Sequence, residues 1–462
     1  RVKLSLHQPQ HGDPIVAIAT APGKGGVGVV RFSFPSPSEF HNFCTAFCGK
    51  LPQARVATLL TLRDFEHHAI DEGIVLLFNG PASFTGEHVL EFQGHGGQAV
   101  LQGVLTHALA LARQLNIPLR HAMAGEFTQR AFLNDKLDLA QAEAVADLID
   151  AGSVSAAKAA AASLSGVFSK QVNALADKII HLRLLLEATL DFPEEEIEFL
   201  EKADAKGQLN QILAIHTELL NAAQEGVKFR DGLQIVLVGE PNVGKSSLLN
   251  ALAGEEVAIV SAIAGTTRDR IKQELNIRGI PLVLIDTAGL RHTADEVERI
   301  GIERTRKSVE EADLVVVLKD ATLGDSDSFA EHLALPVGLP SLTVVNKVDL
   351  LASVPADSAQ LIHVSAKKGV GLEKLKDAIM AKVGIAHTPD HGFMARQRHV
   401  DALYVCGEHL SLALEFAQQD DRILDLFAEE LRLAHDALGE ITGRLLPDDL
   451  LGLIFSRFCI GK

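Results

Sequence analysis

The residues best suited to chemistry form an ordered series of short motifs in the second half of the chain. Any one of these motifs could arise by chance, but their order and spacing together predict a complete guanine-nucleotide site. The motifs are Gly239-Glu240-Pro241-Asn242-Val243-Gly244-Lys245-Ser246-Ser247, Gly265-Thr266-Thr267-Arg268-Asp269, Asp286-Thr287-Ala288-Gly289, Asn346-Lys347-Val348-Asp349 and Ser365-Ala366-Lys367.

The glycine-rich motif predicts a phosphate-binding loop. Gly239 and Gly244 allow the backbone to wrap closely around a phosphate, whose charge is met by N–H groups and by the positive end of the following helix. Lys245 is expected to reach the outer phosphates and Ser246 to ligate Mg²⁺. The loop follows an apolar run and precedes a helical pattern, as this role requires.

The next two motifs predict the rest of the phosphate site. Thr267 is expected to be the second Mg²⁺ ligand, on a loop that senses the γ-phosphate. Asp286 follows an apolar run and is expected to hold Mg²⁺ through water, with the amide of Gly289 facing the γ-phosphate.

The last two motifs predict which base is bound. A carboxylate at Asp349 accepts from N1–H and the exocyclic amine of guanine, which adenine does not offer in this arrangement. Asn346 and Lys347 complete this loop, and the segment 365–367 is expected to back the base. A solvated turn is the alternative for the first of these motifs taken alone; within the series, GTP rather than ATP is predicted.

One position departs from the usual small-GTPase pattern. Many of these enzymes place a glutamine after Asp-x-x-Gly to orient the attacking water, whereas this chain has Leu290, which cannot do so. An acidic segment just beyond could supply a carboxylate instead, although a solvated helix start is the alternative for each residue. Its members are Asp295, Glu296, Glu298 and Glu303.

A second glycine-rich string, Gly23-Lys24-Gly25-Gly26-Val27-Gly28, resembles a phosphate loop only in part. It lacks the Lys-Ser/Thr pair, and a strand rather than a helix is expected to follow it. We therefore predict a turn here and no second nucleotide site.

Three changes in residue composition and hydrophobic pattern along the chain predict the elements that position these residues. Short apolar runs with Gly and Pro punctuation (15–19, 27–32, 73–78 and 88–92), with a helical pattern over 98–115, predict a small α/β domain at 1–134. Helical periodicity predicts an all-α domain whose parts are 135–230 and 389–462. Strand-like runs alternating with helical patterns predict an inserted α/β P-loop domain with a mostly parallel sheet at 231–388. Two separate helical bundles are the alternative to an insertion.

Composition excludes several classes of protein. The 462 residues exceed one comfortable core, so a multidomain protein is expected. No run of about 18 apolar residues occurs, so no membrane span is expected, and the start lacks a signal-peptide core. A cytoplasmic protein is the resulting expectation. The net charge of −17 argues against a broad basic nucleic-acid surface, so any RNA contact must be local or shared with a partner.

The four cysteines are too few and too scattered for a disulfide framework. Cys44 and Cys48 could lie one helical turn apart, but two ligands do not make a zinc site. Buried free thiols are the prediction at these positions.

Further strings carry a resemblance that covers essentially the whole chain. They are Ser83-Phe84-Thr85-Gly86-Glu87, Gly94-His95-Gly96-Gly97, Gly125-Glu126-Phe127-Thr128, the run from Phe132 to Glu143 and the terminal Phe458-Cys459-Ile460-Gly461-Lys462. With the nucleotide motifs, they make the chain similar to the bacterial tRNA-modification GTPases of the MnmE, or TrmE, family.

The resemblance implies an N-terminal domain that binds a formyl- or methylene-tetrahydrofolate and forms a homodimer. It implies a flavoprotein partner, MnmG, with which the family adds a carboxymethylaminomethyl or aminomethyl group to C5 of the tRNA wobble uridine. The GTPase domains of the family meet face to face when GTP and K⁺ are bound. The alternative function is a regulatory GTP-binding switch in ribosome assembly without modification activity.

The resemblance also assigns residues. Folate contacts are implied at Arg31, Glu91, Lys136 and Lys462, and K⁺ contacts at Asn242, Ser261, Ile263 and Thr266. Glu298 matches the glutamate that orients the water, and Lys245 and Asn242 are the other residues expected to act in hydrolysis. Cys459 is either a thiolate nucleophile in modification or a small apolar residue that seats the tail. The full set of predicted GTP contacts is Asn242, Val243, Gly244, Lys245, Ser246, Ser247, Ser261, Ala262, Ile263, Ala264, Gly265, Thr266, Thr267, Asp286, Thr287, Ala288, Gly289, Asn346, Lys347, Val348, Asp349, Ser365, Ala366 and Lys367.

Overall fold

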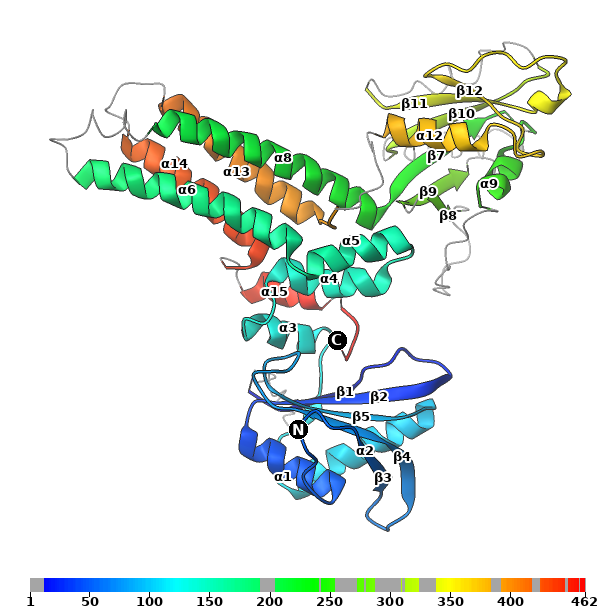
Figure 1. Ribbon diagram of the computed structural model, residues 1–462. Helices are drawn as coiled ribbons and strands as arrows, with labels where there is room; N and C mark the ends of the chain where they lie inside the picture. The colour runs from blue at the N-terminus through cyan, green and yellow to red at the C-terminus, as the bar shows by residue number, and fades with distance from the viewer. Residues whose placement is uncertain are drawn as a thin grey trace, which may run out of the picture. The chain divides into compact units, whose positions relative to one another are not determined.

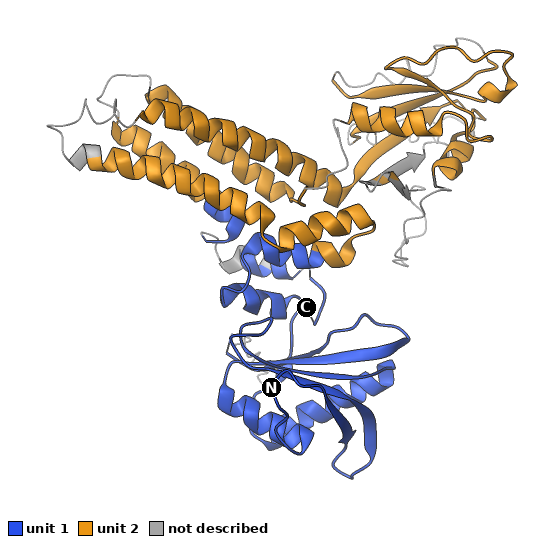
Figure 2. Ribbon diagram, in the orientation of Figure 1, with its two compact units in different colours: residues 1–146, 439–462 blue, residues 147–438 orange. Residues whose placement is uncertain are grey.

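The chain forms two compact units in the computed structural model (Figure 2). One consists of residues 1–146 and 439–462, and the other of residues 147–438. The domain boundaries at 134, 230 and 388 stay predictions. The structure describes residues 12–191, 204–240, 242–253, 272–277, 280–286, 309, 312–323, 338–383, 392–417, 424–444, 448–456 and 458–461.

A six-stranded sheet with the order β3-β4-β5-β2-β1-β6 is the centre of the first unit, among the residues described there (Figure 1). Only the β1–β6 pair is parallel. The predicted runs at 15–19, 27–32, 73–78 and 88–92 all fall in strands of this sheet, whereas β3 and β6 carried no signal that we recognised. The strands are β1 (Ile15–Ile18), β2 (Gly25–Phe34), β3 (Thr58–Arg63), β4 (Ala69–Phe78), β5 (His88–Gly96) and β6 (Arg120–His121).

Two helices, α1 (Pro37–Cys48) and α2 (Gln98–Gln114), bury one face of this sheet. The N-terminus of α1 is specified locally, because the hydroxyl of Ser36 accepts from the amide of Glu39 and Pro37 occupies the first turn. Phenylalanines dominate the core between helix and sheet, and several of their rings pack edge to face.

The remainder of the first unit is helical and holds the end of the chain. Its helices are α3 (Glu126–Leu133), the part of α4 (Leu139–Asp150) up to residue 146, and α15 (Asp448–Phe455). Phe455 and Phe458 pack against Leu139. The tail pairs with the segment before α3 through an Ala124–Ile460 bridge. Gly125 has φ 66°, and a Cβ there would lie 2.6 Å from the carbonyl oxygen of Phe455, so only glycine fits this approach.

Long helices on both sides of the nucleotide motifs in sequence pack against each other in the second unit. The Nε2 atom of His216 on α8 lies 2.7 Å from the carbonyl oxygen of Leu403 on α13. The Ser163 hydroxyl exchanges 2.9 Å hydrogen bonds with the backbone of Met394. The segment between these helices is therefore an insertion, as predicted. The helices are α5 (Val154–Leu164), α6 (Val167–Asp191), α8 (Ala205–Asp231), α13 (Gln397–Phe416) and α14 (Leu424–Thr442).

The inserted segment contains the second sheet, in the order β12-β11-β10-β7-β9-β8 among its described residues. The sheet is parallel except for β8, which pairs antiparallel with β9, so the predicted mostly parallel sheet is confirmed. Its elements are β7 (Leu233–Gly239), α9 (Lys245–Ala253), β8 (Lys272–Ile277), β9 (Ile280–Asp286), β10 (Leu314–Asp320), β11 (Ser341–Asn346), the 3₁₀ helix η2 (Val348–Leu350), β12 (Leu361–His363) and α12 (Leu372–Lys382).

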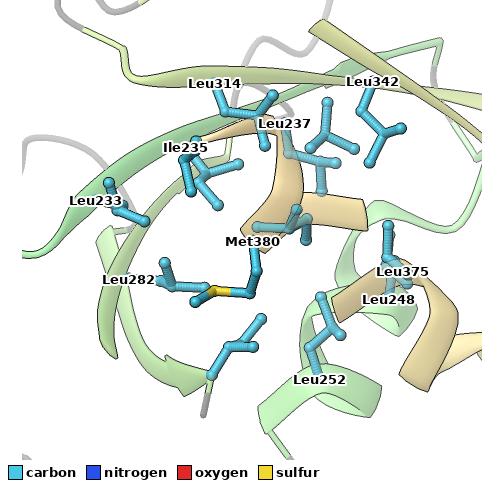
Figure 3. Close-up of a cluster of buried hydrophobic side chains, with 14 of the residues drawn as sticks. Leu233, Ile235, Leu237, Leu248, Leu252, Leu282, Leu314, Leu342, Leu375 and Met380 are labelled. Carbon is cyan, nitrogen blue, oxygen red and sulfur yellow. The ribbon is translucent and has the colours of Figure 1, made fainter. Parts of the chain in front are cut away.

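Alternation along β7 buries both faces of this sheet. Leu233, Ile235 and Leu237 pack with leucines of α9 and α12 on one face (Figure 3). Val236 and Val238 pack into a separate cluster on the other face. Both faces of β7 are thus covered by apolar contacts, as is usual for a strand of a parallel sheet. Polar groups that could bind a ligand therefore lie at its carboxyl end.

Among the helices that the structure describes, none combines the length and apolar character that crossing a membrane requires.

Candidate functional site

The predicted phosphate loop connects the end of β7 to the start of α9. Gly244 has φ 96°, and a Cβ there would lie 2.3 Å from Nδ2 of Asn346. Glycine is therefore required both by the backbone conformation and by the close approach of that side chain. Asn242 also adopts the left-handed region, with φ 66°, where asparagine is better tolerated than most residues.

Lys245 lies inside this loop. Its Nζ donates to the carbonyl oxygens of Gly239 at 2.5 Å and Glu240 at 3.2 Å, and the residue is 7% exposed. Ser246 and Ser247 follow in the first turn of α9 and are exposed. The loop thus presents hydroxyl groups at a helix N-terminus with an ammonium group beneath it, which is a suitable arrangement for an anion.

The predicted base-reading loop is joined directly to the phosphate loop by Asn346 at the end of β11. Its Nδ2 donates to the carbonyl oxygen of Val243 at 3.0 Å, and its Oδ1 accepts from the amide of Ala366 at 3.0 Å. The residue is 2% exposed. A single buried amide therefore ties three of the predicted motifs together.

Asp349 is held by the last of these motifs, the segment 365–367. The hydroxyl of Ser365 donates to Oδ1 of Asp349 at 2.6 Å. This hydrogen bond is the main reason that the pKa of Asp349 is lowered, so its carboxylate is charged at neutral pH. A charged acceptor is what recognition of guanine N–H groups requires.

Lys347 forms a second connection and involves a residue that the sequence reasoning missed. Its Nζ donates to the carbonyl oxygen of Asn242 at 2.8 Å and pairs with Oδ2 of Asp320 at 2.6 Å. Asp320 ends β10, the neighbour of β7, and its position at the carboxyl end of a parallel strand was the available signal. Burial acts to raise the pKa of Asp320, but hydrogen bonds from Lys347 and Thr322 outweigh it and the pKa is lowered.

Several predicted nucleotide residues lie outside the described part of the chain: Ser261–Thr267, Thr287–Gly289 and the water-orienting candidate Glu298. The backbone of Asp286 is described, and it ends β9 directly opposite Leu237 of β7. The structure therefore brings the phosphate-loop and base-loop motifs together, and the predictions for the other positions stay predictions.

The glycine-rich string at 23–28 differs from the phosphate loop, because no helix follows it. Gly25 to Gly28 belong to β2 and pair with β5, and Gly23 precedes the strand with φ 147°. A strand rather than a helix follows, as predicted. The predicted turn over 23–28 is wrong for Gly25 to Gly28, because these residues already belong to β2.

Two of the implied folate residues meet in the first unit. Arg31 and Glu91 are cross-strand neighbours on β2 and β5, and Nε of Arg31 lies 2.8 Å from Oε1 of Glu91. Nη1 of Arg31 also donates to the carbonyl oxygen of Gly461 at 3.4 Å. The guanidinium lies 5.9 Å from the ring centres of Phe84 and Phe127.

Lys136 is linked to the same neighbourhood through the segment 81–86. Its Nζ donates to the carbonyl oxygen of Pro81 at 3.0 Å, and Nδ2 of Asn134 donates to that of Thr85 at 2.8 Å. Phe84 of this segment faces Arg31. Lys462 lies outside the described residues.

A buried ionic network beside this region was not predicted. Glu126, which is 2% exposed, accepts from both terminal nitrogens of Arg120 at 2.7 and 2.9 Å and from Arg130 at 3.0 Å. Arg130 continues to Glu87 at 2.9 Å. Burial acts to raise the pKa of Glu126, but the hydrogen bonds from Arg120, Met123 and Arg130 prevail and lower it.

The cysteines divide by exposure. Cys44 and Cys406 are buried free thiols, whereas Cys48, which was predicted to be buried, is a half-buried one; burial raises the pKa of Cys48 and of Cys406 to about 12. Among the described residues, no cluster of ligands suits a metal ion, and Cys44 and Cys48 form none. Cys459 is free and exposed, and its carbonyl oxygen accepts from the amide of Gly125 at 3.2 Å.

Comparison with known proteins covers almost the whole chain. Residues 14–136 match the model of the GTP-binding protein TrmE N-terminus, and residues 139–459 match that of the MnmE helical domain. A tRNA modification GTPase MnmE of Bordetella petrii is 55% identical over 97% of this chain and 98% of its own. The MnmE of Ralstonia nicotianae is 54% identical over 97% of this chain and 96% of its own.

Solved structures give a more limited similarity. A crystal structure of Aquifex aeolicus Era bound to GDP and AlF₄⁻ is 27% identical, covers 42% of this chain and 69% of that one, and has a TM-score of 0.27. The family models and the near full-length relatives decide the assignment: this chain belongs to the MnmE, or TrmE, family of tRNA modification GTPases.

Proposed function

We propose that this chain is a K⁺-activated GTP hydrolase that modifies C5 of the tRNA wobble uridine together with the flavoprotein MnmG, using a one-carbon tetrahydrofolate. The observation that supports it best is the connection of the phosphate loop to the base-reading loop through the buried side chain of Asn346. This connection fixes the distance between two sites that one guanine nucleotide would occupy.

Within this proposal each phosphate-loop residue has a separate role. Lys245 would exchange its loop carbonyl partners for the outer phosphate oxygens, with little change in the position of α9. The amides at the start of α9 would orient the phosphates, and Asp349 would accept from guanine. Glu298 would orient the attacking water in place of the glutamine that Leu290 replaces.

The cation ligands proposed are hard oxygen donors. Ser246 and Thr267 would hold Mg²⁺, and Asn242, Ser261, Ile263 and Thr266 would hold K⁺; hydroxyl, amide and backbone oxygens suit both ions. Bound there, the cations would neutralise charge that develops on the transferred phosphoryl group. The exposed position of Asn242 in the loop fits this use.

The proposed folate site comprises Arg31, Glu91, Lys136 and Lys462. Arg31 and the partly exposed ring of Phe84 offer a charged and an aromatic surface side by side, which suits a conjugated ligand with carboxylates. Glu91 would accept from pterin N–H groups. Folate would supply the one-carbon unit, and the ion pair of Arg31 with Glu91 orients both side chains before binding.

The proposed function is tested by analysing the wobble uridine of tRNA by mass spectrometry after deletion of the gene. Loss of the C5 modification, restored by this chain but not by Asp286→Ala, is the expected result. Unchanged uridine modification after deletion would favour a GTP-binding switch instead.

The proposed role of K⁺ is tested by measuring GTP hydrolysis in K⁺ and in Na⁺ at equal ionic strength. Faster hydrolysis in K⁺ is expected. Equal hydrolysis rates in K⁺ and Na⁺ would show that Asn242 does not hold an activating K⁺.

A further inference from the structure

Asp320 lies at the carboxyl edge of the second sheet, between the phosphate loop and the base-reading loop. It ends β10, whose neighbours are β7, which leads into the phosphate loop, and β11, which leads into the base loop. Its side chain is 6% exposed. A buried carboxylate is costly unless it is paired and hydrogen-bonded, so its partners indicate its use.

Both oxygens of this carboxylate are engaged. Oδ1 accepts from the amide of Thr322 at 2.9 Å and from its hydroxyl at 2.7 Å. Oδ2 pairs with Nζ of Lys347 at 2.6 Å. The two bonds from Thr322 fix the orientation of the carboxylate, and the carboxylate in turn fixes the end of the lysine side chain.

Lys347 carries this constraint to the phosphate loop. Its Nζ also donates to the carbonyl oxygen of Asn242 at 2.8 Å. Lys347 and Asn242 both have left-handed backbone conformations, with φ 67° and 66°. This conformation is unfavourable for lysine and better tolerated by asparagine, so the contacts of Lys347 in particular must stabilise it.

We propose that Asp320 is a positioning residue for the nucleotide site, which holds Lys347 across the phosphate loop and thereby fixes the backbone of Asn242. The inference rests on the nucleotide site proposed above and adds a residue that the motifs do not include. It has two consequences: loss of the Asp320 charge releases nucleotide faster, and it weakens the response to K⁺, because Asn242 is a proposed ligand of that ion.

The first test measures dissociation of GDP that carries a methylanthraniloyl fluorophore from the full chain. Asp320→Asn keeps the size of the side chain and removes its charge, and the dissociation rate is expected to rise about tenfold, as for loss of one charge-assisted hydrogen bond. Thr322→Ala removes one donor to the carboxylate and is expected to shift the rate in the same direction by a smaller factor. An unchanged rate in Asp320→Asn overturns the proposal.

Asp357→Asn is the matched control. Asp357 belongs to the same inserted segment and pairs with Lys374 at 3.0 Å and with His363 at 3.1 Å, but it contacts none of the nucleotide motifs through these bonds. It should leave GDP dissociation as in the unaltered chain. Equal acceleration by both substitutions would indicate general loosening of the fold and would overturn a specific role for Asp320.

A double-mutant cycle with Lys347→Met tests the route of the effect. If Asp320 acts through Lys347, Asp320→Asn should have little further effect on GDP dissociation in the Lys347→Met background. Additive effects would show that Asp320 acts independently of the lysine and would overturn the positioning role.

The cation consequence is measured as the K⁺ concentration that gives half-maximal hydrolysis. Asp320→Asn should raise this concentration, whereas Asp357→Asn should not. Absence of K⁺ activation in the unaltered chain would count against the proposed function alone, because GDP dissociation reports on Asp320 without K⁺.

Discussion

Arg31 makes contacts of several kinds, and this makes it the residue on which the proposed folate site can be tested. It pairs with Glu91, reaches the carbonyl oxygen of Gly461 and lies against two aromatic rings. Arg31→Ala should weaken binding of a reduced folate by about ten- to a hundredfold, because a charged hydrogen-bond donor is lost and Glu91 is left without it.

Equilibrium dialysis with 5-formyl-tetrahydrofolate would measure this change. Arg63→Ala, at an exposed arginine of β3 that donates to the carbonyl oxygen of His67, is the control and should bind normally. Arg31→Lys should bind more weakly than the unaltered chain, since an ammonium group lacks the planar fork of arginine. Undiminished folate binding by Arg31→Ala would show that Arg31 does not belong to the folate site.

The cysteines allow a second test at this scale. Cys459 is exposed, while Cys44 and Cys406 are buried with raised pKa values, so iodoacetamide should modify Cys459 first in the native chain. Peptide mass spectrometry after graded alkylation would measure the order. Early modification of Cys406 would contradict its burial. Fast alkylation of Cys459 at neutral pH would favour its role as a thiolate nucleophile over its role as a small apolar residue that positions the tail.

At the scale of elements, the start of α3 depends on the Glu126 network. Glu126 joins β6 to α3 through Arg120 and to the following turn of α3 through Arg130. Glu126→Gln removes the carboxylate that Arg120 and the buried Arg130 share. Arg130 keeps Glu87 and Arg120 keeps Asp13, so the free energy of unfolding should fall by about 2 kcal/mol, as for loss of charged hydrogen bonds. Urea denaturation of the full chain would measure it, with Glu66→Gln, at an exposed side chain, as the control.

The pH dependence of this effect has a definite sign. The pKa of Glu126 lies below its usual 4.5 in the folded chain, so its contribution is complete above pH 4.5 and is lost as pH falls through the lowered pKa. The difference between Glu126→Gln and the unaltered chain should therefore be constant from pH 6 to 8 and shrink in acid. A difference that grows on acidification would contradict the lowered pKa.

Elements also show how far the sequence could be read. Strands β7, β9, β10, β11 and β12 were predicted because each carries a run of apolar residues; β7 and β10 are buried along almost their whole length, whereas β11 is buried on one face. The edge strand β8 (Lys272–Ile277) begins with three polar residues and has only Leu275 and Ile277 as apolar ones, so the apolar run that identified the others was absent. It pairs antiparallel with β9. Likewise, Asn346 and Asp349 follow from a motif, whereas Asp320 owes its role to Lys347, a partner distant in sequence that spacing does not reveal.

For the whole molecule, separate cores predict separate unfolding. The first unit is organised around the phenylalanine-rich core of its sheet, and the second around the cluster shown in Figure 3. Differential scanning calorimetry of the full chain should show two transitions. GDP at a hundred times its Kd should stabilise only the second unit, by about 2.7 kcal/mol, and a reduced folate only the first. One transition that both ligands shift would show that the units unfold together.

The pairing of α8 (Ala205–Asp231) with α13 (Gln397–Phe416) has a consequence for synthesis of the chain. When α8 leaves the ribosome, its partner has not been translated, and the intervening sheet domain is made during a delay on the order of ten seconds. Throughout that time α8 lacks α13, and His216 lacks its partner, the carbonyl oxygen of Leu403. The nascent protein therefore passes through a stage in which the sheet domain can be folded while α8 still lacks α13. Chaperones are expected to bind most at this stage, because the helical domain is then incomplete.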